Sequence, residues 1–204
     1  MNDLERRLAS PPARTSHFED LAAGLRRRAE RAGLLDVAYA TADSPLGPLT
    51  VLVTPAGLVR IRYPDEPLEA TLQDAADRIS PRVLEAPERT DEVRRELDEY
   101  FEGRRRSFDL PLDWRLVRGF AGDVLRATAR VPFGVVTTYR AMAEAAGSPR
   151  AYRAAGNALG SNPIPIVVPC HRVLHTGGGL GGYTGGVARK EYLLELEGSL
   201  PPRG

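Results

Sequence analysis

Three closely spaced prolines restrict what this chain can fold into around its only cysteine. The segment reads Asn162-Pro163-Ile164-Pro165-Ile166-Val167-Val168-Pro169-Cys170-His171-Arg172-Val173. Proline lacks a backbone donor and disfavours helical geometry in the residue before it, so no regular helix fits here. We therefore expect a stiff, extended segment with buried apolar residues, which ends where Cys170 meets His171 and Arg172.

The lone thiol leaves two interpretations open. A chain with one cysteine cannot form an internal disulfide, and histidines at 17, 171 and 175 lack paired metal-ligand spacing, so we expect no metal site. Cys170 is either a buried, inert residue or a nucleophile, because an adjacent imidazole and guanidinium favour the thiolate. A reducing cytoplasm suits both. No apolar run is long enough to span a membrane, and the charged N-terminus is unlike a secretory signal.

The first half of the chain predicts a small α/β domain over residues 36–112. Alternating apolar residues predict strands at Val37–Thr41, Leu49–Thr54 and Leu58–Tyr63, and the Thr54-Pro55-Ala56-Gly57 turn joins the last two as a hairpin. Helices are expected over residues 68–79 and from Thr90 to Gly103. Residues 1–35 form an extension that we expect to be helical, and residues 111–114 form a linker.

Residues 113–204 are expected to form a mainly helical second domain, so the predicted class is α+β with two domains. One helix should run from Leu116 to Arg130. Thr138 should cap a second over residues 139–146, and Ser148-Pro149 should start a third, which makes a helix-turn-helix. From residue 130 onward, the chain has eight basic and four acidic residues. This excess of positive charge is compatible with a polyanion partner or with a solvated surface.

The third of these helices has two distinct faces. Apolar and small residues share the side predicted to pack inward: Ala151, Tyr152, Ala155, Ala158 and Leu159. Another side carries Arg150, Arg153 and Asn157, with Ala154 and Gly156 nearby. Small residues beside arginines let a helix approach a DNA groove closely, but a solvated helix face has the same composition.

The motif Pro-Cys-His-Arg-Val at 169–173 resembles the active-site signature of the O6-alkylguanine-DNA alkyltransferases, the methylated-DNA–protein-cysteine methyltransferases. The resemblance covers residues 114–198 continuously. It includes Val-Pro-Phe-Gly at 131–134, Thr-Tyr at 138–139, Arg153, Asn-Pro at 162–163, Gly-Gly-Tyr-Thr-Gly-Gly at 181–186, Lys-Glu-Tyr-Leu-Leu at 190–194 and Glu-Gly at 197–198. Residues 36–112 are compatible with the family's N-terminal domain.

The resemblance implies a catalytic role for five residues. Cys170 would accept the alkyl group, His171 would act as base through a water molecule, and Glu197 would orient His171. Tyr139 would turn the nucleotide's phosphate and donate a proton toward the departing guanine, and Asn162 would brace the turn before the cysteine.

The same resemblance implies the partner. Duplex DNA containing O6-alkylguanine would bind through Arg153, which fills the stack behind the flipped base, and through Tyr139, Arg150, Ala154, Gly156 and Asn157. The base pocket would consist of Tyr183, Thr184, Leu159, Pro165, Val173 and Gly181. No cofactor, metal or membrane is expected, and the protein is expected to be a monomer, with cooperative binding along DNA and activity on O4-alkylthymine left open.

The chemistry fits this scheme and constrains the alternatives. A guanine O6 lies inside the duplex, so the base must be flipped at a cost of about a few kcal/mol. The thioether product has no activated bond for water to attack, which predicts a single turnover. A lesion-binding relative without transfer should lack the acceptor cysteine, which this chain has. A cysteine hydrolase would need an oxyanion site that the sequence does not indicate.

Overall fold

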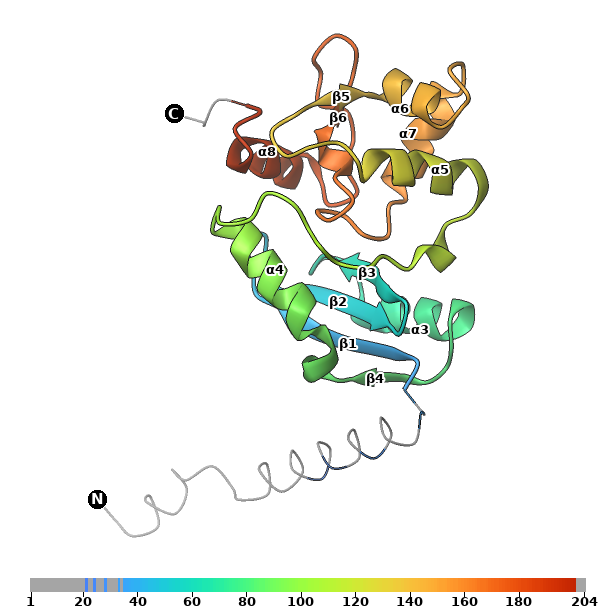
Figure 1. Ribbon diagram of the computed structural model, residues 1–204, viewed down its shortest axis with the longest axis vertical. Coiled ribbons are helices and arrows are strands. Elements are labelled where there is room, and N and C mark those ends of the chain that lie inside the picture. The colour runs from blue at the N-terminus through green and yellow to red at the C-terminus, as the bar shows by residue number, and fades with distance from the viewer. Residues whose placement is uncertain (1–20, 22–23, 25–27, 29–32, 34, 201–204) are drawn as a thin grey trace, which may run out of the picture.

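The computed structural model describes residues 35–200 together with residues 21, 24, 28 and 33, so most of the expected N-terminal helix lies outside the described residues. A four-stranded sheet with two helices forms the N-terminal part, and helices α5 to α8 form the C-terminal part (Figure 1). The predicted class, α+β with a small sheet domain and a helical domain, is confirmed. Within the described part of the chain, every helix is too short or too polar to cross a membrane.

The sheet has the order β3-β2-β1-β4. Strands β1 (Val37–Ala42), β2 (Leu49–Thr54) and β3 (Gly57–Arg62) are antiparallel neighbours, and the predicted hairpin joins β2 to β3. Strand β4 (Val83–Glu85) pairs in parallel with β1 and was not predicted. Three residues are too few to give a sequence pattern, and a parallel partner lies far away along the chain.

Both faces of the sheet are covered. Helix α3 (Leu68–Arg78) packs on one face, where Ala75 contacts a small core with Val37, Leu52 and Val59. The other face is covered by α4 (Asp91–Phe101), which follows the short 3-10 helix η1 (Pro87–Thr90), and by the C-terminal part. All six residues of β2 are therefore buried, because successive side chains alternate between two covered faces.

The expected linker is hydrogen bonded to the sheet. The amide of Leu58 donates to the carbonyl of Pro111 at 2.8 Å, and the amide of Asp113 donates to the carbonyl of Leu58 at 2.8 Å. A side chain at Gly57 would lie 2.1 Å from the Pro111 carbonyl oxygen, so this approach requires glycine. The linker thereby fixes the second half of the chain against β3.

The predicted start of the helix after the linker is wrong. Asp113 accepts a hydrogen bond from the Arg115 amide and caps a 3-10 turn, η2 (Trp114–Leu116), and the chain is then extended at Val117. Helix α5 (Gly119–Thr128) begins only at Gly119. A local cap thus competes with helix propensity over residues 116–118.

The helix-turn-helix consists of α6 (Tyr139–Ala145) and α7 (Tyr152–Gly160). Thr138 caps α6 as predicted, because its hydroxyl accepts from the Ala141 amide at 3.2 Å. Ser148 does not cap α7. A turn over residues 148–151 comes first, closed by the Ala151 amide on the Ser148 carbonyl at 2.9 Å, so α7 begins later than predicted.

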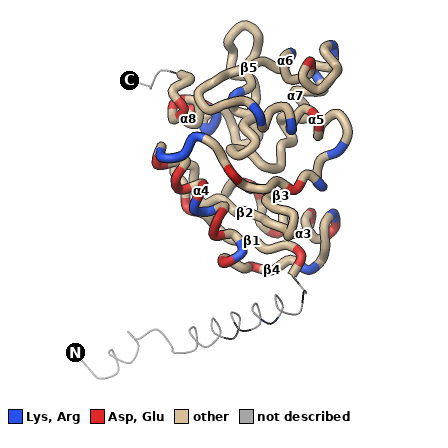
Figure 2. The backbone as a smooth tube through the Cα atoms, in the orientation of Figure 1, with Lys and Arg blue, Asp and Glu red and all other residues tan. Residues whose placement is uncertain are grey.

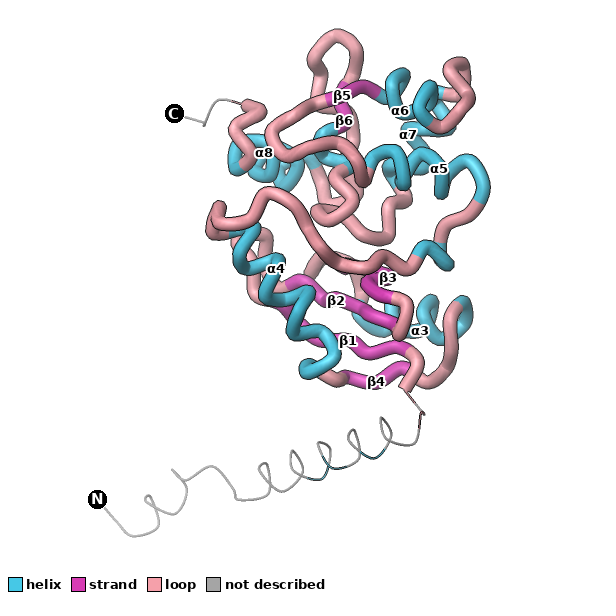
Figure 3. The backbone as a smooth tube through the Cα atoms, viewed as in Figure 1, coloured by secondary structure: helices cyan, strands magenta, loops and turns pink. Residues whose placement is uncertain are grey.

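The segment before the cysteine folds as successive turns and is not extended. Its apolar residues are buried as predicted, but Val168 donates to the carbonyl of Ile164 at 2.9 Å, and Ile166 has a left-handed φ of 74°. The short strands β5 (Thr137–Thr138) and β6 (Val173–Leu174) pair in parallel on either side of it in sequence, and α8 (Val187–Leu196) closes the structure. Figure 3 shows that residues between α7 and α8 are mostly loop.

Candidate active site

The structure places Cys170 at the start of the 3-10 turn η3 (Cys170–Arg172), directly after the proline segment. The cysteine is 4% exposed. Asn162 holds this turn: its Nδ2 donates to the Val168 carbonyl at 2.8 Å and to Cys170 Sγ at 3.1 Å, and its Oδ1 accepts from the Ile164 amide at 3.0 Å. One buried amide side chain therefore fixes both the backbone turn and the sulfur.

Next to the thiol, His171 and Glu197 form a buried pair. The Nε2 of His171 lies 3.0 Å from Glu197 Oε1, and neither side chain is exposed. An ionised carboxylate only accepts, so Nε2 carries the proton and Nδ1 keeps a lone pair. Nδ1 is buried and has no hydrogen-bond partner among the described residues. Burial lowers the pKa of His171, which is therefore neutral and able to accept a proton.

Two further residues fix Glu197. Arg172 donates to both carboxylate oxygens, at 2.8 and 2.7 Å, and the Tyr100 hydroxyl donates to Oε1 at 2.7 Å. Burial alone would raise the pKa of Glu197, but the hydrogen bonds from His171 and Arg172 outweigh it and lower the pKa to about 2. The carboxylate thus stays charged beside the imidazole.

The chain's only lysine lies close to the same site. Lys190 is fully buried, and its ammonium donates to the carbonyls of Val173, at 2.6 Å, and Leu180. Burial lowers the pKa of Lys190 to about 8. Burial also raises the pKa of the Cys170 thiol to about 11, against the hydrogen bond from Asn162 and the positive charge of Lys190, which lower it. At neutral pH the thiol is therefore protonated and needs a base to react.

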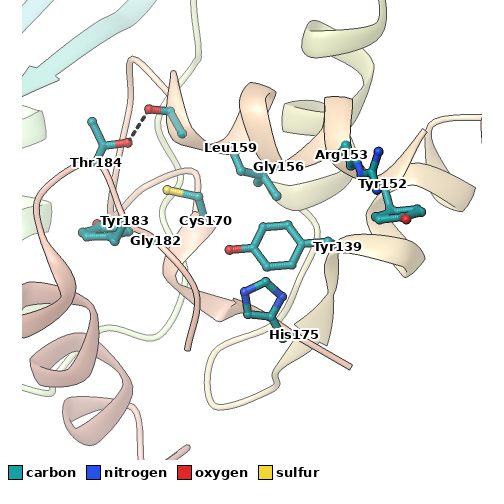
Figure 4. A pocket seen from close by; sticks show the side chains of 11 residues that line it. Tyr139, Tyr152, Arg153, Gly156, Leu159, Cys170, His175, Gly182, Tyr183 and Thr184 are labelled. Atoms are coloured by element: carbon teal, nitrogen blue, oxygen red, sulfur yellow. Dashed lines mark hydrogen bonds between the residues drawn. The ribbon is translucent and has the colours of Figure 1, made fainter. Parts of the chain in front are cut away.

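Cys170 opens into a cavity of about 460 Å³. Helices α6 and α7 form one side, and the glycine-rich segment 177–186 forms the other. The lining residues are Tyr139, Tyr152, Arg153, Gly156, Leu159, Gly160, Cys170, His175, Gly182, Tyr183 and Thr184. In Figure 4 the Tyr139 ring extends across the cavity, with its hydroxyl toward the side where Cys170 and Tyr183 lie. The buried thiol of Cys170 and the phenol of Tyr139 thus line one cavity, and His171, paired with Glu197, packs against Tyr183 of the cavity wall.

Family models match almost the whole described chain. The model of the ribonuclease-like domain of 6-O-methylguanine DNA methyltransferase matches residues 37–114, and that of its DNA-binding domain matches residues 119–199. The chain belongs to this methyltransferase family.

Known members of the family are similar over most of their length. The methylated-DNA–protein-cysteine methyltransferase of Mycobacterium bovis is 40% identical over 164 residues, which cover 80% of this chain and 94% of that protein. The constitutive enzyme of Bacillus subtilis is 36% identical and covers 78% and 94%. The crystal structure of Mycobacterium tuberculosis O6-methylguanine methyltransferase has a TM-score of 0.68 at 38% identity, covering 82% and 96%, and the same protein has been solved in complex with DNA.

Helix α7 differs from the helix predicted for this methyltransferase. Arg153, Ala154 and Asn157 are exposed on it, and Gly156 is half-buried beside the Tyr139 ring. Arg150 lies in the turn before α7 and so does not share the helical stripe. Tyr152 is 42% exposed and not packed inward, because Arg140 and Arg153 each place a guanidinium about 5.9 Å from its ring centre.

Three residues expected at the base pocket do not line the cavity: Pro165, Val173 and Gly181. Val173 and Pro165 are buried in the turns around Cys170. Gly181 lies against Tyr139, where a side chain would come within 2.5 Å of the Tyr139 hydroxyl, at a left-handed φ of 69°. Thr184 and Leu159 do line it, and the Thr184 hydroxyl donates to the Gly160 carbonyl at 2.8 Å.

Residues that support the site of this methyltransferase from elsewhere in the chain were not predicted. Tyr100 comes from α4 of the N-terminal part, 97 residues before Glu197, and no local pattern links the two. The sequence indicates Arg172 only as a positive charge near the thiol. Lys190 lies within the family motif, and its uniqueness as a lysine among 28 basic residues was the available signal.

Proposed function

We propose that this protein repairs alkylated DNA by transferring an alkyl group irreversibly from O6 of a flipped-out guanine to Sγ of Cys170. The observation that carries the proposal is the buried thiol at the cavity, which is hydrogen bonded to Asn162 and adjacent to the His171–Glu197 pair. The relatives named above as methylated-DNA–protein-cysteine methyltransferases support it. O4-alkylthymine is a second possible substrate of the same chemistry.

The first step is removal of the thiol proton. His171 Nδ1 is buried, carries a lone pair and has no hydrogen-bond partner among the residues that the structure describes, so it can accept the proton through a bridging water. The imidazolium that forms is stabilised by Glu197, which Arg172 and Tyr100 hold in place. Lys190 supplies a fixed positive charge near the thiolate.

The second step is displacement at carbon. A sulfur–carbon bond forms as the bond between the alkyl carbon and guanine O6 breaks, and guanine leaves with the electron pair. Burial raises the pKa of Tyr139, so its phenol keeps its proton at neutral pH and can donate toward the leaving base. The thioether that remains on Cys170 cannot be hydrolysed, so each molecule reacts once.

Access to O6 requires the base to leave the duplex. Arg153 is exposed on α7 at the rim of the cavity, where it can fill the stack behind the flipped base. Arginines 140, 150 and 153 gather in the α6–α7 region, with Glu144 as its only acidic residue, and Figure 2 shows this basic end of the molecule. Ala154 and Gly156 provide small residues near Arg153, and Asn157 adds a polar side chain.

The proposal also specifies the DNA partner, the oligomeric state and the fate of the protons. The partner is duplex DNA carrying O6-alkylguanine, bound by a monomer that needs no cofactor or metal. The protons balance: the thiol proton goes to His171, guanine takes a proton from Tyr139, and the proton held by His171 returns to Tyr139 through solvent. A free reactive thiol also suits the reducing cytoplasm.

An intact-mass experiment tests the proposal. The protein is incubated with duplex DNA that contains one O6-methylguanine, and we expect a mass increase of one methylene group, mapped to the peptide of Cys170, with one transfer per molecule. Cys170→Ser should bind the same duplex and gain no mass. An unchanged mass of the wild-type protein would disprove transfer, and tight lesion binding without transfer would instead indicate a recognition protein.

A further inference from the structure

Tyr63 connects the N-terminal sheet to the wall of the cavity. It is the residue after β3, and it is fully buried. Its hydroxyl lies 2.7 Å from the hydroxyl of Tyr183, and the two rings meet edge to face with their centres 6.2 Å apart. Tyr183 lines the cavity beside Cys170 (Figure 4). A residue 120 positions away thus contacts the base pocket directly.

The surroundings hold the Tyr63 ring in one position. The guanidinium of Arg189 lies 4.6 Å from the ring centre, and it also donates to the Gly185 carbonyl and pairs with Asp65, both at 2.7 Å. A side chain at Gly185 would come within 2.6 Å of the Tyr63 ring, so the backbone packs directly on the aromatic face. Tyr63 is therefore a fixed point from which a hydroxyl can position another group.

Tyr183, by contrast, stands in the glycine-rich segment 177–186. Seven of the ten residues at 177–186 are glycine, which loses more conformational freedom on folding than any other residue. Near Tyr183, the Gly186 amide donates to its carbonyl at 2.9 Å. The Tyr183 ring stands edge to face with His171, at 6.4 Å between centres. The hydroxyl contact with Tyr63 thus anchors a glycine-rich wall whose Tyr183 ring contacts His171.

We propose that Tyr63 is a positioning residue for alkyl transfer: its hydroxyl holds the Tyr183 ring in place beside Cys170 and His171. The inference rests on the proposed function, and it makes the N-terminal part of the chain a contributor to the base pocket. Burial raises the pKa of both phenols, so the pair stays a neutral hydrogen bond at neutral pH. A wall fixed in advance lets the substrate enter a reactive geometry without ordering the loop first.

Single-turnover kinetics on methylated duplex DNA tests the inference through Tyr63→Phe, Tyr183→Phe and the double variant. Phenylalanine keeps the ring against Gly185 and Arg189 and removes only the hydroxyl. We expect Tyr63→Phe to lower the transfer rate constant at saturating DNA by about 3- to 10-fold, the range for losing one hydrogen bond, with an unchanged DNA dissociation constant. Tyr183→Phe should lose a similar factor, and the double variant should lose no more.

Tyr192→Phe on α8 is the matched control, since it removes a hydroxyl outside the cavity, and it should react like the wild-type protein. Wild-type-like transfer by Tyr63→Phe, or losses in the double variant that multiply, would overturn the inference while the wild-type mass increase still supports the proposed function. A rate loss that only follows a fall in melting temperature would make Tyr63 a packing residue. Absence of transfer by the wild-type protein would defeat both proposals.

Discussion

His171 Nε2 donates to Glu197 Oε1 at 3.0 Å, and both side chains are completely buried. This contact joins η3 to the end of α8 across 26 residues. The same carboxylate also accepts from Arg172, so one ionised group serves the proposed base and neutralises a buried guanidinium. Both the stability of the folded protein and the proposed reaction therefore depend on the charge of Glu197.

Glu197→Gln should lower both stability and transfer. It leaves Arg172 without its buried counter-charge, a change that costs about 3–5 kcal/mol in the free energy of unfolding. The folded pKa of Glu197 is about 2 against an ordinary 4.5, so its stabilisation is complete above pH 4.5 and is lost as pH falls toward 2. In urea unfolding, the gap between wild type and variant should therefore be widest near pH 7 and narrow steadily below pH 4.5. A gap that is constant with pH would contradict an ionic role.

Lys190→Met should move the pH profile of transfer. The positive charge of Lys190 lowers the pKa of the Cys170 thiol, so its removal raises that pKa and leaves less thiolate at any given pH. We expect a slower reaction near neutral pH that recovers as the solution becomes more alkaline, measured with O6-benzylguanine as a small substrate. If the rate falls equally at every pH, Lys190 acts through its hydrogen bonds to the Val173 and Leu180 carbonyls and not through its charge.

Arg153→Ala should separate base flipping from chemistry. Without the side chain that fills the stack, transfer from O6-methylguanine in duplex DNA should slow by about 10-fold, equivalent to about 1.4 kcal/mol. Reaction with free O6-benzylguanine, which needs no flipping, should stay unchanged. Arg126→Ala on α5 removes the same charge from another exposed helix and serves as the control. Equal losses on both substrates would place Arg153 in the cavity chemistry instead.

Turn and capping rules predicted those parts of the fold whose decisive interactions lie within a few residues of one another. The hairpin at Thr54 to Gly57 and the Thr138 cap follow from turn and capping chemistry within four residues, and both are confirmed. Ser148-Pro149 has the same kind of signature, yet the chain forms a separate turn before α7. A helix cap and a separate turn both suit the residues at 148–151. The packing of α7 against α5 and α6 selects the turn.

The proposed site likewise contains residues that a local motif locates and residues that only long-range packing brings in. The motif around Cys170 locates the thiol and His171, because these residues are adjacent in sequence. Tyr63 follows strand β3 and Tyr100 belongs to helix α4, and their local patterns indicate only burial. Their hydroxyls reach the site through the packing of the two halves of the chain. Contacts across about 100 residues leave no periodic trace in one sequence, so only the folded structure reveals them.

Gly156→Ala should stabilise the protein and impair transfer. Gly156 lies within α7, where alanine is favoured over glycine by about 0.5–1 kcal/mol. Its added methyl would meet the Tyr139 ring at 3.8 Å, an ordinary contact, but it would occupy the cavity where the base must enter. We expect a higher melting temperature with a transfer rate several-fold lower. The control is Gly122→Ala on α5, which meets mainly the flexible end of Arg126 and should change stability without slowing transfer. A faster or unchanged Gly156→Ala protein would show that the base does not pass Gly156, because a methyl group that lines the path of the base must hinder its entry.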